Sequence, residues 1–482
     1  MGDSASAAVH GGAVDATTRE GATANVKAVK DLPLPKVWAF AIGQFGWALL
    51  SGIISNWLVY FYQPDQETIA QGQTVFVPQG LVVLGIVTVV GGITAFARFF
   101  DAFVDPAVAS LSDRCDARSG RRMPFLKFAA LPLALITVLV FWSPINGTSW
   151  VNAAFLFVTV IGYYIALTFY CTPYNALIAE LGHDSKQQLT ISTAISFTWV
   201  AGTAIAYVAP VIWGGLVPAM GRITAIRVTF TIMAAVAFVC MLVPPLAIRE
   251  RDYVNSQPTS ESTVESLKQT FGDGEFRKFV CSDVVYWVAI TTFQTGLPFF
   301  VTSLLKLPET TTTIYFVLMT GVSVLFYLPV NLLANRVGKK SLLLVAFVIF
   351  TCAFAFAGAL GSGALAFLPA MTQGLILSVV GAIPMAAFGI LPQAIVANIA
   401  DASSRVTGQD RQGMFYAART FAMKMGQSVA MLLFTGVSTI GVASGMGYRI
   451  AAVCAAVLCG IGGIVFAFYN ERKVLDVLGA ER

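Results

Sequence analysis

Long apolar segments are the feature of this sequence that most restricts its fold. The run GLVVLGIVTVVGGITAFA before Arg98 is long enough to cross about 30 Å of hydrocarbon as a helix. Apolar residues make up 57% of the 482 residues and charged residues 11%, whereas soluble domains carry about 25% charged residues. A single soluble core could not bury this much apolar sequence. We therefore predict an all-α, multi-pass membrane protein.

Apolar segments of sufficient length recur along the chain and indicate twelve transmembrane helices. We expect them near residues 37–62, 79–111, 123–143, 151–178, 188–213, 225–248, 278–305, 311–335, 340–361, 366–398, 413–438 and 446–469. The segments 188–213 and 413–438 are the most polar, which is typical of helices that face the interior of a bundle rather than lipid.

Lys and Arg residues fall mainly on one side of the predicted spans. The connections on the other side carry only Arg222, Arg227, Lys306 and Arg449. Because cytoplasmic connections are enriched in Lys and Arg, this asymmetry predicts both termini in the cytoplasm. We expect a multi-pass protein of the plasma (inner) membrane that contacts the lipid bilayer.

The longest hydrophilic connection, 249–277, divides the chain into two six-helix halves, 36–248 and 278–470. The second span of each half ends similarly, in DPAVASLSDR…GRR and in LPVNLLANRVGKK. Two such halves across a central cavity form the major facilitator fold, whose ligand sites lie near the midplane. Residues 1–35, rich in Ala, Gly, Thr and Ser, predict a disordered cytoplasmic tail, and 471–482 form a second cytoplasmic tail.

Charged residues inside the predicted spans are candidates for function, because each costs about 2.5–3.5 kcal/mol to insert at a helix centre. Asp101 and Asp105 are four residues apart and share one helix face. Two stacked carboxylates repel unless a cation or a proton lies between them, so they predict a cation or proton site. The alternative is a purely structural network in which both aspartates pair with Arg98 and Lys424.

The candidate segment RTFAMKMGQS carries Arg419, Thr420 and Lys424. Lys424 lies deep in its span, where its ammonium cannot easily reach either interface, and we expect it to contact the carboxylates of the first half when no cation is bound. Thr420 shares its face. Arg419 is expected either to contact substrate or to form a salt bridge, and Asp283 is interpreted as a charge at a helix end.

Three segments, RFFDAFVDPAVASLSDR…GRRMPF, CTPYNALIAEL and ARTFAMKMGQS, resemble the glycoside–pentoside–hexuronide:cation symporters, over about residues 36–470. The resemblance implies alternating-access symport of a sugar or sugar-derived solute with a coupling cation. It implies that Asp101, Asp105 and Thr168 form the cation site, and that Lys424 lies beside it. No cofactor is implied, and a metal ion would bind Asp101 and Asp105 only if the coupling ion is Na⁺.

The chain departs from this family at the expected sugar site. Ala48 and Cys171 stand where the melibiose-type transporters have sugar-binding carboxylates, and Asn175 replaces a stacking tryptophan. Because carboxylates hold sugars by accepting hydroxyl hydrogen bonds, their loss, with Arg419 adding positive charge, suggests a solute with a carboxylate, sulfonate or phosphate. Val104 replaces an amide ligand of the sodium-using relatives, so we rank H⁺ above Na⁺.

Other function classes are less compatible with the sequence. A lysolipid or other amphiphile transporter of the same fold remains the alternative, with Arg419 and Lys424 binding the headgroup. We predict that the chain is not an enzyme, because it shows no nucleophile–base constellation, phosphate-binding glycine loop or histidine cluster. The basic residues follow the positive-inside pattern and give no support for nucleic-acid binding. We expect a monomer with a small-molecule solute, a glycoside or a sugar acid, as its partner.

Overall fold

A computed structural model describes residues 31–254, apart from 84, 86, 116, 118–119 and 183–184, together with residues 270–407 and 412–479. Within these ranges the chain is helical, and the only β-pairings are two isolated bridges, Val83–Val87 and Ala117–Gly120. The all-α prediction is confirmed.

Twelve long helices follow one another in the described residues. They are α1 (Leu34–Tyr62), α3 (Val89–Asp113), α4 (Met123–Val140), α5 (Trp150–Leu181), α6 (Ser185–Met220), α7 (Arg222–Ala247), α9 (Gly274–Phe299), α10 (Thr310–Val337), α11 (Lys339–Ala359), α12 (Ala370–Thr407), α13 (Gln412–Val437) and α14 (Met446–Ala467). The shorter elements are α2 (Gln66–Ala70), α15 (Glu471–Leu478), the 3₁₀ turns Glu250–Asp252, Gly363–Leu365 and Val442–Ser444, and a π turn, Phe300–Leu304, that continues α9.

Each predicted span overlaps one of these helices, but some boundaries were wrong. The span predicted at 79–111 starts ten residues too early, because α3 begins at Val89, where the Thr88 hydroxyl accepts a hydrogen bond from Gly91 N–H as an N-cap. Helices α6 and α12 run on past their predicted ends to Met220 and Thr407. The predicted tail at 471–482 contains α15. Residues 1–30 of the predicted N-terminal tail and 255–269 of the predicted central loop lie outside the described residues.

Ten of the long helices are long and apolar enough to cross a membrane, which supports an integral, multi-pass membrane protein. Helices α3 and α13 are not among these ten. They carry the internal charges Arg98, Asp101 and Asp105 on α3, and Arg419 and Lys424 on α13. Helix α3 packs against α5 and α13, and α13 also packs against α9.

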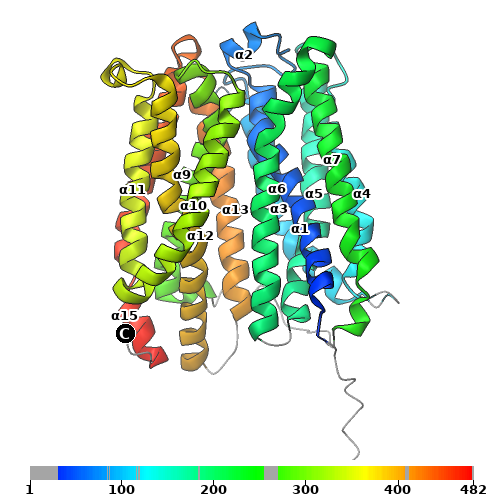
Figure 1. The fold of residues 1–482 in the computed structure, drawn as a ribbon, viewed down its shortest axis with the longest axis vertical. Helices are drawn as coiled ribbons and strands as arrows, with labels where there is room; N and C mark the ends of the chain where they lie inside the picture. The colour runs from blue at the N-terminus through cyan, green and yellow to red at the C-terminus, as the bar shows by residue number, and fades with distance from the viewer. Residues whose placement is uncertain are drawn as a thin grey trace, which may run out of the picture.

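The helices form two groups that stand side by side (Figure 1). In the first group α1 packs on α6 and α7, and α4 packs on α5 and α7; in the second, α14 packs on α9 and α11, and α12 packs on α10 and α11. The groups meet where α3 contacts α13, α6 contacts α10 and α1 contacts α9. Helix α2 lies at one end of the bundle and α15 at the other (Figure 1). We call these the α2 end and the α15 end.

The same helix cap occurs once in each group, at the two turns whose sequences resemble each other. The Glu250 carboxylate accepts hydrogen bonds from the backbone N–H groups of Arg121, Arg122 and Met123, where α4 begins. The Glu471 carboxylate accepts from Lys339 and Lys340 N–H, where α11 begins. In both cases a carboxylate that follows the last long helix of its group satisfies amides that have no partner inside their own helix.

A glycine precedes each of these capped turns because the backbone and the carboxylate both demand it. Gly120 has φ +125° and Gly338 has φ +92°, backbone conformations that residues with a side chain rarely adopt. A Cβ atom at Gly120 would lie 2.3–2.6 Å from atoms of Glu250, and one at Gly338 would lie 3.1 Å from Glu471 Oε2. The repeat seen in the sequence is therefore also a repeat of structure.

We expect Glu250→Ala to destabilise the protein by ~1–3 kcal/mol, because buried amides at the start of α4 would lose their acceptor. Thermal unfolding of the purified protein measures this loss as a lower midpoint. Glu250→Gln keeps one acceptor oxygen and should lose less, and Asp252→Ala, an exposed neighbour in the same turn, is the matched control. An Ala variant as stable as the wild-type protein would contradict this role.

Candidate functional site

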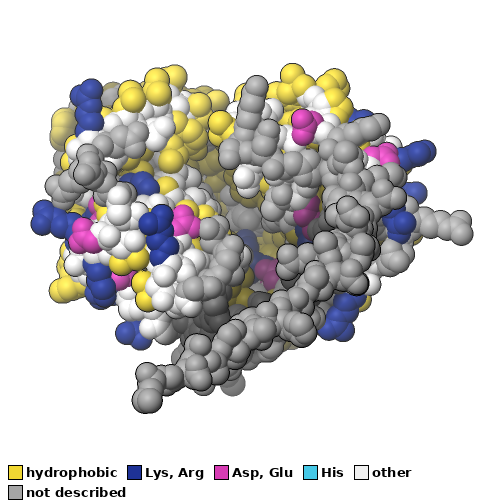
Figure 2. Space-filling view, turned by 90° about the horizontal axis from the view of Figure 1, so that it is seen from below, with side chains coloured by type: hydrophobic (Ala, Val, Ile, Leu, Met, Phe, Trp, Pro, Cys, Tyr) yellow, Lys and Arg dark blue, Asp and Glu magenta, His cyan; other side chains and the backbone are white. Residues whose placement is uncertain are grey.

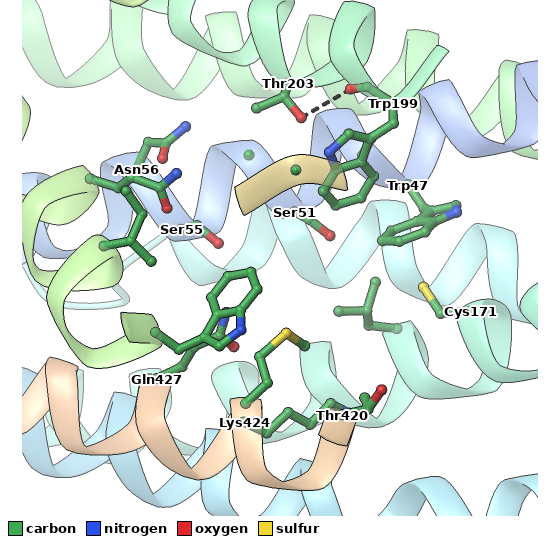
Figure 3. A pocket seen from close by; sticks show the side chains of 18 of the residues that line it. Trp47, Ser51, Ser55, Asn56, Cys171, Trp199, Thr203, Thr420, Lys424 and Gln427 are labelled. Carbon is green, nitrogen blue, oxygen red and sulfur yellow. Dashed lines mark hydrogen bonds between the residues drawn. The ribbon is translucent and has the colours of Figure 1, made fainter. Parts of the chain in front are cut away.

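A cavity of about 530 Å³ lies between the two groups of helices. Its wall is formed by α1, α3, α5 and α6 of the first group and by α9, α10, α12 and α13 of the second. Figure 3 shows Ser51, Ser55 and Asn56 of α1 opposite Lys424 and Gln427 of α13. From below, the molecule is hollowed between the two groups at the α15 end (Figure 2).

Lys424 forms ion pairs with both aspartates of α3. Its Nζ atom lies 2.7 Å from Asp101 Oδ2 and 2.6 Å from Asp105 Oδ2. The two carboxylates meet one ammonium because they are one helical turn apart on the face of α3 that packs on α13. A single positive charge thus lies between the two groups of helices and holds two like charges together.

Two threonines of α5 complete this cluster from the other side. Thr168 Oγ1 donates to Asp101 Oδ1 at 2.5 Å, and Thr172 Oγ1 donates to Asp105 Oδ1 at 3.3 Å. The threonines are also four residues apart, so the one-turn spacing on α3 is matched on α5. Thr172 was not predicted from the sequence, although its spacing from Thr168 could have identified it.

Arg98 lines the cavity but is held by neutral groups. Its Nη1 donates to Gln427 Oε1 at 2.9 Å and its Nη2 to Ser55 Oγ at 3.3 Å, and the guanidinium lies 4.9 Å from the centre of the Tyr164 ring. Among the described residues, no carboxylate lies within ion-pair distance of it. The predicted structural network is therefore present for Lys424 and absent for Arg98.

Arg419 does not line the cavity, and of its two expected roles, substrate contact or a salt bridge, the structure shows the salt bridge. Its guanidinium pairs with Asp283 of α9 through Nε–Oδ2 at 2.9 Å and Nη2–Oδ1 at 3.1 Å, and both side chains are buried. The interpretation of Asp283 as a helix-end charge was wrong, because it lies inside α9 and neutralises Arg419. The anionic-solute hypothesis consequently loses the support that Arg419 gave it.

The remaining predicted residues all lie in the cavity wall: Ala48, Cys171, Asn175 and Thr420. The Thr420 hydroxyl is already used within α13, where it donates to the carbonyl of Tyr416 at 3.0 Å. The sequence reasoning missed the aromatic part of the wall, which includes Trp47, Trp199 and Trp287. Trp47 and Trp199 stand edge to face with ring centres 4.9 Å apart. No periodic pattern marks such isolated aromatic residues in an apolar helix.

A second polar network joins the two groups at the α2 end. The buried Glu309 carboxylate accepts from Arg222 Nη2 at 2.7 Å, Tyr60 Oη at 3.0 Å and Trp213 Nε1 at 2.6 Å. These three donors belong to α7, α1 and α6, whereas Glu309 immediately precedes α10. One carboxylate of the second group thus binds three helices of the first.

A second carboxylate at the α2 end belongs to the first group and binds residues of the second. Asp65 of the first group accepts from the hydroxyls of Thr302 and Ser303, on the π turn that continues α9. Close by, Gln63 Nε2 donates to Thr435 O and Ser438 Oγ, each at 2.9 Å. At the α15 end, by contrast, Arg122 pairs with Glu180 and Asp113, which belong to its own group. The named polar contacts therefore join the groups at the α2 end and brace one group internally at the α15 end.

Comparison with known proteins places these features in a family. Residues 39–468 match the family described as MFS/sugar transport protein. The isoprimeverose transporter of Lactiplantibacillus pentosus is 22% identical over 410 residues, which cover 83% of this chain and 78% of that protein. The inner membrane symporter YicJ of Escherichia coli is 26% identical over 226 residues, 46% of this chain and 47% of that protein.

A third relative, the uncharacterised symporter YnaJ of Bacillus subtilis, is 25% identical over 187 residues, 38% of this chain and 36% of that protein. The alignments to YnaJ and YicJ thus span less than half of either relative. Among solved structures, the nucleoside transporter NupG has a TM-score of 0.64 at 12% identity, over 91% of this chain and all of that one. A bacterial homologue of the lysosomal transporter Spinster has a TM-score of 0.62 at 13% identity, over 92% of this chain and 97% of that one. These likenesses establish the fold.

We expect Arg419→Gln to lower stability by ~3–5 kcal/mol, because removing one partner leaves Asp283 charged and buried without compensation. The measurement is thermal unfolding of the detergent-purified protein. The double variant Asp283→Leu with Arg419→Leu removes both charges and should recover much of the loss. Arg277→Gln, in the first turn of the same α9, is the control. An Arg419→Gln protein that unfolds at the wild-type temperature would show that the pair is not structural.

Proposed function

The chain belongs to the MFS/sugar transport protein family, and from this premise we propose that it is a cation-coupled symporter of a sugar or sugar-derived solute. The observation that carries the proposal is the ion cluster of Lys424, Asp101 and Asp105 in the wall of a cavity between two groups of helices. The resemblance to the glycoside–pentoside–hexuronide:cation symporters is confirmed by relatives named as symporters, and the protein is a transporter rather than an enzyme.

The proposed coupling step is an exchange of cations at the acidic pair. The Lys424 ammonium stands where a coupling cation would bind, so an arriving cation relieves the repulsion between Asp101 and Asp105 and releases Lys424. The release breaks the ion pairs between α13 and α3 and changes the cavity wall where solute binds. Whatever the cation adds to solute affinity, the solute adds to cation affinity.

We propose H⁺ in preference to Na⁺ as the coupling ion. The oxygens around the cluster come from the two carboxylates and from the hydroxyls of Thr168 and Thr172. Val104, immediately before Asp105, offers no side-chain oxygen. A proton needs only one carboxylate oxygen, whereas Na⁺ needs several oxygen ligands.

We propose that α3 and α13 complete twelve membrane spans in two six-helix halves, 36–248 and 278–470, with both termini in the cytoplasm of a plasma (inner) membrane. Arg222 and Lys306 lie on the side of the predicted spans that carries few Lys and Arg residues, and both lie at the α2 end. The α2 end therefore faces away from the cytoplasm. The hollow between the two groups at the α15 end (Figure 2) then faces the cytoplasm. The solved Spinster homologue is also described as inward-facing. We propose a monomer as the working unit.

Alternating access then requires the network around Glu309 to separate. At the α2 end this network joins Arg222, Tyr60 and Trp213 to one carboxylate of the other group. The lysolipid or amphiphile alternative is not favoured, because the named relatives are sugar transporters and symporters.

We expect Asp101→Asn and Asp105→Asn each to abolish gradient-driven accumulation while leaving an inserted, folded protein, because a neutral amide has no negative charge to exchange between Lys424 and the coupling cation. Proteoliposomes with an imposed pH or Na⁺ gradient and a panel of labelled glycosides and sugar acids give the measurement. Asp113→Asn, a carboxylate on the same helix but outside the cavity, should still accumulate solute. Accumulation by both cavity variants would place the ion site elsewhere.

We expect Glu309→Gln to open the α2 end more often, because the neutral amide loses its ion pair with Arg222. Cys171 lines the cavity and reports this opening through its labelling by a membrane-impermeant maleimide from outside right-side-out vesicles. Labelling should rise several-fold over the wild-type protein, and this rise should be absent when Cys171→Ser is added. Glu67→Gln breaks the exposed pair with Lys306 at the same end and should change little. Unchanged labelling in Glu309→Gln would show that this network does not control the opening of the α2 end.

A further inference from the structure

We infer that the backbone at Lys306 is a strained switch at the α2 end. It is held in a left-handed conformation while the two groups of helices are joined there, and it relaxes when they separate. Because strain is released on separation, the switch favours opening of that end. The inference rests on the proposed function, since alternating access requires this separation.

Lys306 has an unusual backbone conformation for a residue with a side chain. Its φ is +54°, and in the part of the chain that the structure describes it is the only residue other than glycine with a positive φ. In the left-handed region the Cβ atom crowds the following carbonyl oxygen, so residues other than glycine are strained there. Helices commonly end on a left-handed residue, but that residue is usually glycine, as Gly479 is after α15. A lysine holds the position here.

The helix that ends at Lys306 is also wider than an α-helix. In the π turn Phe300–Leu304, which continues α9, Leu305 N–H donates to Phe300 O at 3.0 Å, and beyond it Leu307 N–H donates to Val301 O at 3.0 Å. Each bond spans one residue more than its counterpart in an α-helix or in a regular left-handed helix end. Turns of this kind are rare and frequently mark functional sites. Two departures from regular backbone therefore occur in direct succession.

Contacts with the first group of helices hold this segment. The Asp65 carboxylate, which is 1% exposed, accepts from the hydroxyl of Thr302 at 2.7 Å and from that of Ser303. The Lys306 ammonium pairs with Glu67. Asp65 is the N-cap of α2 and Glu67 belongs to that helix, so all three contacts cross the boundary between the groups. Strained backbone persists only where its surroundings enforce it, and separation of the groups removes these contacts.

The residues before Lys306 are fixed by their own group. A Cβ atom at Gly361 would lie 2.0 Å from Leu304 O, and one at Gly445 would lie 3.0 Å from Leu304 Cδ2. The turns before α12 and α14 therefore pack closely on Leu304. The Lys306 side chain, by contrast, is 59% exposed. Its backbone can relax while the preceding helix stays in place.

Relaxation at Lys306 would move Glu309, which follows three residues later and joins three helices of the first group. Between them stands Pro308, whose ring fixes φ and makes the connection stiff. The strained residue thus lies between two sets of contacts that join the groups, those of Thr302 with Asp65 before it and those of Glu309 after it. When one set breaks, the change at Lys306 weakens the other, so both separate together.

We expect Lys306→Gly to favour the joined groups, because glycine adopts a positive φ without strain. Opening is measured by the labelling of Cys171, in the cavity wall, with a membrane-impermeant maleimide added outside right-side-out vesicles. Labelling of the same protein with Cys171→Ser is subtracted. The rate that remains should fall about five-fold or more below that of the wild-type protein.

Lys306→Ala is the matched control. It removes the ammonium and the pair with Glu67, as the glycine variant does, but alanine remains strained at positive φ. Because the pair is exposed, labelling should stay within about two-fold of the wild-type rate. Thermal unfolding of both purified variants checks that each is folded. Equal labelling in the glycine and alanine variants, or faster labelling in the glycine variant, would overturn the inference.

A second set of variants tests the hold of Asp65 on the segment. Thr302→Val combined with Ser303→Ala removes two donors from the buried carboxylate, so labelling should rise several-fold. Adding Lys306→Gly should return it toward the wild-type rate, because the relief of strain offsets the lost contacts. Ser444→Ala, an exposed hydroxyl between α13 and α14, should change little. Labelling of the double variant at the wild-type rate would show that Asp65 does not hold the segment, and would refute the switch.

The labelling needs neither solute nor an ion gradient, so it separates the switch from the proposed function. Faster labelling in Glu309→Gln, with unchanged labelling in Lys306→Gly, would leave the opening at the α2 end standing and refute the switch. Slower labelling in Lys306→Gly, with solute accumulation by both Asp101→Asn and Asp105→Asn, would support the switch and refute the proposed ion site.

Discussion

The ammonium of Lys424 between Asp101 and Asp105 is the interaction on which the rest of the structure depends. It pairs Asp101 and Asp105 of α3 with Lys424 of α13, and these are the two long helices that are not among the ten apolar enough to cross a membrane. It also joins the two groups of helices at the level of the cavity. Since one cation holds the pair, another cation can replace it, and the contact that stabilises the bundle is also the one that a transported ion would alter.

The sequence predicted those parts of the protein that follow from local patterns. The apolar segments located the helices, and the four-residue spacing of Asp101 and Asp105 identified the acidic pair. Thr88 shows where the sequence reasoning fell short, because its N-cap hydrogen bond sets the start of α3, which was predicted too early. Asp283 and Arg419 show its limit, because they are 136 residues apart and only the packing of α9 on α13 brings them together.

The polar contacts at the two ends of the bundle differ in kind. At the α15 end, Glu250 and Glu471 each brace helices of one group, and the glycines before α4 and α11 make room for them. At the α2 end, Glu309 and Asp65 bind across the boundary between groups. Two units that are internally braced at one end and joined at the other suit a rocking motion, in which each group moves as a body while the cavity between them changes its opening.

The carboxylate of Glu309 also bears on how strongly solute appears to bind from each side. A network with three donors on one buried acceptor favours molecules that are shut at the α2 end. Solute arriving there can bind only the fraction that is open, so its apparent dissociation constant exceeds the intrinsic one by the reciprocal of that fraction. The same wall residues would then give a weaker apparent affinity for solute that arrives at the α2 end than for solute that arrives at the α15 end. Equal solute concentrations on the two sides of the membrane would then occupy the cavity to different extents.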